Sequence, residues 1–185
     1  MGIDKIVAYS VGKKGEISPF DDELNARVAP GAGPRHLTFH PNGKHVYVIN
    51  ELLNTVTVFN YNSCNGLLTE TQTIATLPED FEGVSHTADI KLTPDGRFAY
   101  GTNRGHDSLA SYRVMQDGTL ELIDITASLG GGPQNLAITP DGRMLICANM
   151  AGGNLALFHI DEEKGSLAPV GKVHQLTAPS CIMIR

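Results

Sequence analysis

Residues 34–62 read PRHLTFHPNGKHVYVINELLNTVTVFNYN, and this stretch recurs twice further along the chain. The second copy begins at His86 and reads HTADIKLTPDGRFAYGTNRGHDSLASYRV, and the third begins at Gly132 and reads GPQNLAITPDGRMLICANMAGGNLALFHID. Each copy carries a Pro-Asn-Gly or Pro-Asp-Gly turn, and the three prolines are Pro41, Pro94 and Pro140. Successive turns are therefore 53 and 46 residues apart, which indicates a repeat architecture.

The runs around each turn predict β-strands. In the first copy LTF precedes the turn, HVYVIN follows it, and TVTVFNYN and LTETQTIAT come next, all rich in Val, Ile, Thr and Tyr. Four strands in about fifty residues are typical of one blade of a β-propeller. The sequence therefore predicts an all-β propeller segment, a single partial domain over 1–185 with complete four-stranded blades at 34–82, 83–130 and 131–177.

The two ends of the chain match parts of the repeat. GIDKIVAYSVGKKGEIS, from Gly2, resembles GHDSLASYRVMQDGTLEL, from Gly105, and predicts the third and fourth strands of a partial blade within residues 1–33. APSCIMIR, from Ala178, resembles the opening of a repeat and predicts a closing strand at 178–185. Three complete blades cannot close a ring, because propellers use about 4 to 8. We therefore expect the closing strand to add either to the initial strands of the same chain or to those of a second copy, in which case a homodimer completes the ring.

One polar position is shared by all three copies. Nine residues after the turn proline, each copy has an asparagine: Asn50, Asn103 and Asn149. A side chain that caps a strand end or a turn is the favoured interpretation. An alternative is a hard cation such as Ca²⁺ held by Glu51, Asn103 and Asn149, since calcium prefers oxygen ligands. No second carboxylate matches that set, so we expect no metal and no cofactor.

Other polar positions differ between the copies and so are not explained by the repeat. They are Arg35, His36, Glu51, His86, Arg104 and Gln134, with His106 in the loop after Arg104. Equivalent positions of adjacent blades face a common axis, so Glu51 and Arg104 should lie close together at one mouth of the central channel. Arg35 and His36 can both point into the channel only if their strand is bulged. A cluster that merely ties blades together is the alternative to a functional site.

Bulk composition excludes several classes of protein. The chain has 14 basic and 20 acidic residues in 185, a formal charge of −6, which argues against a nucleic-acid partner. No apolar run approaches the ~20 residues of a membrane-spanning helix. Cys64, Cys147 and Cys181 form no CxxC pair, and MGIDKIVAYS is not a secretory leader. These features predict a soluble, cytoplasmic protein.

The quoted segments, above all GPRH followed by NEL and then HTADI with NRG, resemble the seven-bladed lactonase family. That family includes propeller 6-phosphogluconolactonases, of the pentose phosphate pathway, and the fungal enzyme that lactonises 3-carboxy-cis,cis-muconate. The resemblance spans essentially the whole chain and corresponds to the C-terminal half of a family member. It implies a channel site that uses Arg35, Glu51 and Arg104, with His86 at another characteristic position.

Hydrolysis of a lactone requires an activated water, stabilisation of the oxyanion and a proton for the leaving oxygen. We expect Glu51 to act as general base and Arg35 and Arg104 to bind a phosphate or carboxylate and the oxyanion, with His86 as proton donor or positioning group. His36, His106 and Gln134 are expected to contact the substrate, a phosphorylated or carboxylated lactone. Lactonising cyclase activity and a truncated, non-catalytic assembly module are the alternatives.

Overall fold

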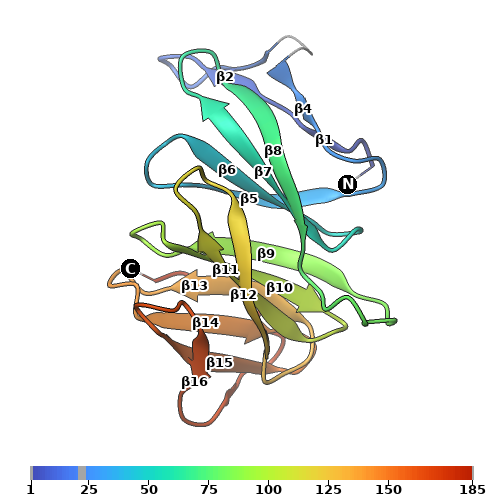
Figure 1. Ribbon diagram of the computed structural model, residues 1–185, viewed down its shortest axis with the longest axis vertical. Coiled ribbons are helices and arrows are strands. Elements are labelled where there is room, and N and C mark those ends of the chain that lie inside the picture. Colours follow the sequence, from blue (N-terminus) through green and yellow to red (C-terminus); the bar gives the residue numbers. More distant parts are fainter. Residues whose placement is uncertain (1, 21–23, 185) are drawn as a thin grey trace.

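The computed structural model describes residues 2–20 and 24–184, and in these residues the chain forms strands and no α-helices (Figure 1). Three antiparallel sheets dominate it. The first contains β5 (Pro34–Phe39), β6 (His45–Asn50), β7 (Thr55–Asn62) and β8 (Leu67–Ala75). The second contains β9 (His86–Leu92), β10 (Phe98–Arg104), β11 (Ser108–Val114) and β12 (Leu120–Ala127). The third contains β13 (Pro133–Ile138), β14 (Met144–Asn149), β15 (Asn154–Ile160), β16 (Leu167–Pro169) and β17 (His174–Gln175).

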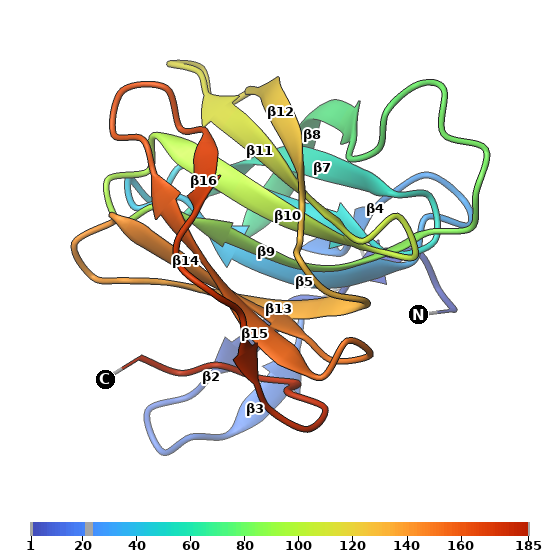
Figure 2. The same cartoon turned by 90° about the horizontal axis from the view of Figure 1, so that it is seen from below.

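These sheets are the blades of a propeller segment, so the predicted fold class is confirmed; we call them blades 1, 2 and 3. In blades 1 and 2 the strands lie in sequence order, and in blade 3 the fourth strand is split into β16 and β17, which both pair with β15. The innermost strands β5, β9 and β13 contact one another in turn, as Figures 1 and 2 show. No helix of the described residues is long and apolar enough to cross a membrane.

The predicted partial blade at the N-terminus is present as two short ladders. One joins β1 (Lys5–Ile6) to β4 (Ala26–Arg27), and the other joins β2 (Tyr9–Val11) to β3 (Ile17–Pro19). Residues 21–23, which the sequence places in this partial blade, lie outside the described residues.

The closing strand predicted at 178–185 does not form, because residues 178–184 contain no strand and residue 185 lies outside the described part. A strand exists only beside a hydrogen-bonded neighbour. The ladder contacts that 178–184 would need are replaced by one bond, in which the amide N–H of Ile182 donates to Oδ1 of Asn135 on β13 at 2.8 Å. The prediction of a strand here is therefore wrong, although the segment does dock on the last inner strand.

All three inner hairpins are bulged near the same end. The register shifts between Pro34 and His36 on β5, and between Pro133 and Asn135 on β13; in blade 2 it shifts between Gly101 and Asn103 on β10. An extra residue on one strand of such a pair redirects side chains. From the sequence, Arg35 and His36 were expected to point into the channel together only if their strand is bulged. That bulge is present.

The blades stack face to face on apolar cores. One core joins Tyr47 and Val58 of blade 1 to Ile90 and Tyr112 of blade 2, and a second joins blades 2 and 3. A repeated tie crosses each boundary, where the hydroxyl of Tyr47 donates to the Gly118 carbonyl and that of Tyr100 to the Gly165 carbonyl, both at 2.9 Å. The same packing therefore fixes each inner strand relative to the next.

Blade 1 is less completely covered on its N-terminal side. Four residues before the turn proline stand Leu37, Ile90 and Leu136; the last two are fully buried, whereas Leu37 is 42% exposed. Ile90 and Leu136 have a complete blade in front of them, but Leu37 has only the short N-terminal ladders. Leu37 and Phe39 line an apolar pocket of about 230 Å³ between those ladders and blade 1.

Candidate active site

Two arginines share one carboxylate where the inner strands end. Arg35 lies at the β5 bulge, Glu51 directly follows β6, and Arg104 ends β10. Glu51 Oε2 lies 3.2 Å from Arg35 Nε, and Glu51 Oε1 accepts a hydrogen bond from Arg104 Nη2. The side chains are 10% exposed for Glu51, 19% for Arg35 and 24% for Arg104. The predicted proximity of Glu51 and Arg104 is therefore present, and Arg35 joins them.

Backbone carbonyls of β9 hold both guanidinium groups in place. Arg35 Nη1 donates to the Ala88 carbonyl at 2.6 Å, and Arg104 donates from Nη2 to the Thr87 carbonyl at 3.0 Å and from Nε to the His86 carbonyl at 3.3 Å. The backbone after Arg104 is also constrained: Gly105 has a φ of +103°, and a Cβ there would collide with the Val84 carbonyl. The two cations are thus preorganised.

Blade 3 completes this cluster. Gln134, at the bulge of β13, accepts a hydrogen bond on Oε1 from Arg104 Nη1 at 3.4 Å. The four side chains Arg35, Glu51, Arg104 and Gln134 come from three different blades, and we call them the arginine cluster. An arrangement of two forked cations in a partly exposed position suits bidentate binding of a carboxylate or phosphate.

Glu51 is engaged on both oxygens. Oε1 accepts from Arg104, and Oε2 is buried within ion-pair distance of Arg35 but accepts no aligned hydrogen bond from any described residue. A general base needs an oxygen within reach of a water molecule. The geometry of Glu51 therefore favours a role in orienting the two arginines over the expected role as base, which stays a prediction.

The predicted histidines are distributed differently. His86 has an exposed side chain and contributes its backbone carbonyl to Arg104. His106 Nδ1 lies 2.7 Å from Ser108 Oγ, and its ring packs edge-on against Phe81 with centroids 4.7 Å apart. His36 extends across to β9, where its Nδ1 lies 3.1 Å from Asp89 Oδ1. The structure thus brings Gln134 to the arginines but turns His106 toward its own loop.

Asp89 is the residue that sequence reasoning did not select. Its side chain is fully buried in the inner strand of blade 2, next to the arginine cluster. The only signal was its position five residues before the turn proline, where the other copies have His36 and Asn135. The folded structure shows that these two residues are its hydrogen-bond partners.

The repeated asparagines all make structural hydrogen bonds at strand ends, in agreement with the capping interpretation. Asn50 Nδ2 donates to Thr55 and Thr57 within blade 1, whereas the other two tie blades together. Asn103 Nδ2 donates to the Thr76 carbonyl at 2.7 Å, and Asn149 Nδ2 donates to the Ser128 carbonyl at 2.9 Å. Thr76 and Ser128 each end the preceding blade. A cation would bind the amide oxygens, but Oδ1 of Asn103 accepts a hydrogen bond from Thr76 Oγ1 at 2.6 Å and Oδ1 of Asn149 accepts one from Cys147 Sγ at 3.4 Å, so neither oxygen is a free ligand for a cation shared with Glu51.

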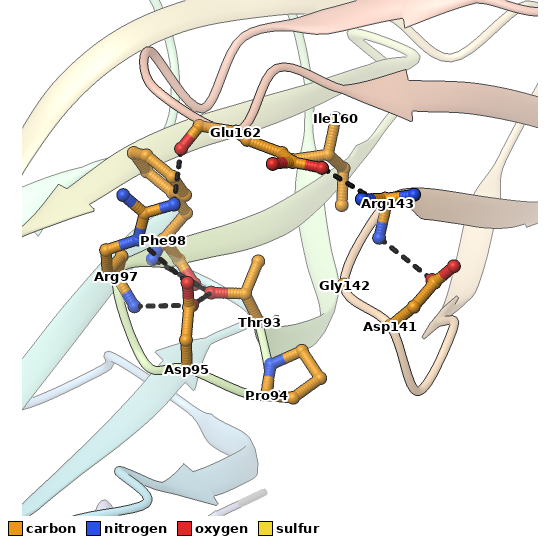
Figure 3. Close-up of a pocket in the computed structure, with 10 residues that line it drawn as sticks. All are labelled: Thr93, Pro94, Asp95, Arg97, Phe98, Asp141, Gly142, Arg143, Ile160 and Glu162. Carbon is orange, nitrogen blue, oxygen red and sulfur yellow. Dashed lines mark hydrogen bonds and ion pairs between the residues drawn. The ribbon is translucent and has the colours of Figure 1, made fainter.

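A depression lies at the other end of blades 2 and 3, between their Pro-Asp-Gly turns (Figure 3). It measures about 230 Å³, and four of its five charged side chains form ion pairs with one another. Arg97 Nε lies 2.8 Å from Asp95 Oδ2, and Arg143 Nε lies 2.8 Å from Glu162 Oε1. These side chains are more than half exposed, so this pocket offers no largely buried, preorganised cation comparable to those of the arginine cluster.

Residues 1–184 match the family model described as "Lactonase, 7-bladed beta-propeller", and the chain belongs to this family. It is 37% identical over 183 residues to 6-phosphogluconolactonase of Bacillus subtilis, covering 98% of this chain and 51% of that protein. Two solved structures superpose on 96% of the chain. A protein from Lactobacillus plantarum gives a TM-score of 0.91 at 29% identity over 51% of its length, and the periplasmic gluconolactonase of Pseudomonas aeruginosa gives 0.88 at 30% identity over 50%. The chain spans about half the length of the curated relatives it matches.

Proposed function

We propose that this chain carries a lactone-hydrolysing site in the channel of the propeller, acting on an anionic sugar lactone such as 6-phosphogluconolactone. The observation that carries the proposal is the pair of guanidinium groups, Arg35 and Arg104, held on the one carboxylate of Glu51. The names of the Bacillus and Pseudomonas relatives support lactone substrates for this family. Because the chain spans about half of those relatives, the activity is proposed for the protein as a whole.

In this proposal the arginines perform two tasks. A guanidinium fork binds a phosphate or carboxylate through two parallel hydrogen bonds. Arg104, which is 24% exposed, has room to exchange its 3.4 Å contact with Gln134 for a substrate oxygen. Arg35 then faces the carbonyl oxygen, where negative charge develops when water attacks the ester. Gln134 and His86 are proposed to contact the rest of the substrate.

The test is an assay of the purified chain with 6-phosphogluconolactone, followed as acid release above the spontaneous rate, beside an assay for lactonisation of carboxymuconate. We expect hydrolysis and no cyclisation. Arg104→Gln should remove most of the hydrolysis, whereas Arg143→Gln, which removes an exposed cation at the far end of blade 3, should leave it unchanged. Cyclisation without hydrolysis would assign the site to the lactonising enzymes of the family instead.

We also propose that a second copy of the chain covers the exposed face of blade 1. Leu37 is 42% exposed and Phe39 is 51% exposed, whereas the residues at the equivalent positions of blades 2 and 3 are more fully buried. Burial of such side chains favours association. Light scattering should give the mass of a dimer, and Leu37→Asp should reduce it; a monomeric mass at all concentrations would refute this assembly. The cytoplasm stays our proposed location, on the basis of three free cysteines.

A further inference from the structure

Asp89 is the most completely surrounded charged group near the arginine cluster. Its Oδ1 accepts hydrogen bonds from Lys91 Nζ at 2.8 Å and from the Ile90 amide at 3.0 Å, and it lies 3.1 Å from His36 Nδ1. Its Oδ2 accepts from Asn135 Nδ2 at 2.7 Å and from the Leu136 amide at 3.0 Å. A carboxylate that is fully buried persists as an anion only with such a set of donors.

We propose that His36 is the catalytic proton-transfer residue of this site and that Asp89 is its positioning residue. The inference rests on the proposed lactone hydrolysis and deepens it. Ionised Asp89 only accepts hydrogen bonds, so the close Nδ1 of His36 must carry the proton. The opposite nitrogen, Nε2, is then left without a proton and can accept one. The side chain of His36 is 47% exposed, so the ring has room for a water molecule or substrate beside it.

The backbone places this imidazole beside the arginine cluster. Arg35 and His36 are consecutive, and the bulge at Arg35 turns both side chains across the same gap between β5 and β9. There they bind consecutive residues, Arg35 the Ala88 carbonyl and His36 the Asp89 carboxylate. A substrate oxygen bound by the Arg35 guanidinium therefore lies next to the His36 ring.

Other candidate bases fit this task less well. Both oxygens of Glu51 face guanidinium groups, and Oε2 is buried. His106 is engaged with Ser108 and Phe81. Among the contacts of the described residues, no buried carboxylate fixes the tautomer of the exposed His86 ring. The His36 ring, in contrast, has the buried carboxylate of Asp89 beside its Nδ1.

The step balances with water as the only co-reactant. Nε2 of His36 takes a proton from water as the water oxygen bonds to the lactone carbonyl carbon, and the carbonyl oxygen becomes an oxyanion next to Arg35. When the tetrahedral intermediate collapses, the bond between the carbonyl carbon and the ring oxygen breaks. The imidazolium then returns its proton to that leaving oxygen, which gives a hydroxy acid and neutral His36. Asp89 holds the Nδ1 proton throughout and stabilises the imidazolium.

The kinetic test replaces the exposed ring without disturbing the core. His36→Gln should lower kcat by about 100-fold or more, in the range of general acid–base catalysis, with KM within about threefold. His159→Gln, on an exposed position of β15, is the matched control and should leave kcat unchanged. Activity of His36→Gln within about threefold of the wild-type chain would overturn the assignment. Absence of turnover in the wild-type chain would instead remove the proposed function.

A spectroscopic test does not depend on turnover. Side-chain ¹⁵N shifts of neutral His36 in the wild-type chain should show a protonated Nδ1 and an unprotonated Nε2. Lys91→Met, which removes the other side-chain donor to Asp89 Oδ1, should retain that tautomer, whereas Asp89→Asn should lose it. If Asp89→Asn does not fold, the wild-type spectrum decides alone. A protonated Nε2 in the wild-type chain would overturn the positioning role of Asp89 whether or not the chain hydrolyses lactones.

Discussion

The ion pairs of Glu51 allow a quantitative prediction for the variant Glu51→Gln. Removal of one partner of a buried ion pair costs about 3–5 kcal/mol, because the other charge is left without compensation. The two arginines are 19% and 24% exposed, so water offsets part of this loss and we expect about 2–3 kcal/mol. For a chain of this length that free energy lowers Tm by roughly 4–12 °C.

The assay is thermal and urea unfolding of Glu51→Gln beside Glu162→Gln. Glu162 pairs with Arg143 at 2.8 Å, but both side chains are about 60% exposed, so its loss should cost less than about 1 kcal/mol. Phosphate should restore more stability to Glu51→Gln than chloride does at equal ionic strength, because an oxyanion can take the place of the carboxylate between the arginines. Equal losses in the two variants, or equal effects of the two salts, would refute the view of Glu51 as the organiser of an anion site.

Three further outcomes are expected. Arg104→Lys keeps the charge but loses the planar guanidinium fork, so steady-state kinetics should show that KM for an anionic lactone rises about tenfold or more. An unchanged KM would contradict the role of the fork. Leu136→Ala should cost about 2–5 kcal/mol in urea unfolding, whereas Leu122→Ala, at a position of β12 that is 42% exposed, should cost about 1 kcal/mol or less. Burial lowers the pKa of His45 in the folded chain, so as the pH falls the imidazole is protonated first in the unfolded chain, and the free energy of unfolding decreases below about pH 6.5. This decrease should be shallower in His45→Gln. Parallel curves of unfolding free energy against pH for the two proteins would contradict the prediction.

The repeat is the reason that so much of the fold is visible in the sequence. Three turns at Pro41, Pro94 and Pro140 locate three hairpins, and strand composition supplies the rest of each blade. The same alignment predicted that Glu51 and Arg104 meet, since equivalent positions of adjacent blades are neighbours in space. The bulge at Arg35 also followed, as a condition for two consecutive inward side chains.

Other features depend on contacts that a repeat alignment does not contain. The segment 178–184 matches the start of a blade, but no neighbouring strand pairs with it within the described residues, and it docks through Ile182. Asp89 stands at a position where the copies differ. Its carboxylate accepts hydrogen bonds from side chains on three inner strands, which come together only when the chain folds. His106 was expected near a substrate from its place beside Arg104, yet Ser108 and Phe81 hold its ring.

The central claim is that the arginine cluster binds the anionic group of a lactone that the site hydrolyses. Its most direct test compares kcat/KM for 6-phosphogluconolactone and for unphosphorylated gluconolactone, in the wild-type chain and in Arg104→Gln. We predict that the wild-type chain prefers the phosphorylated lactone by about 10- to 150-fold, the value of one charge-assisted contact, and that Arg104→Gln loses this preference. Equal kcat/KM values for the two lactones in the wild-type chain, or a preference that survives in Arg104→Gln, would contradict it.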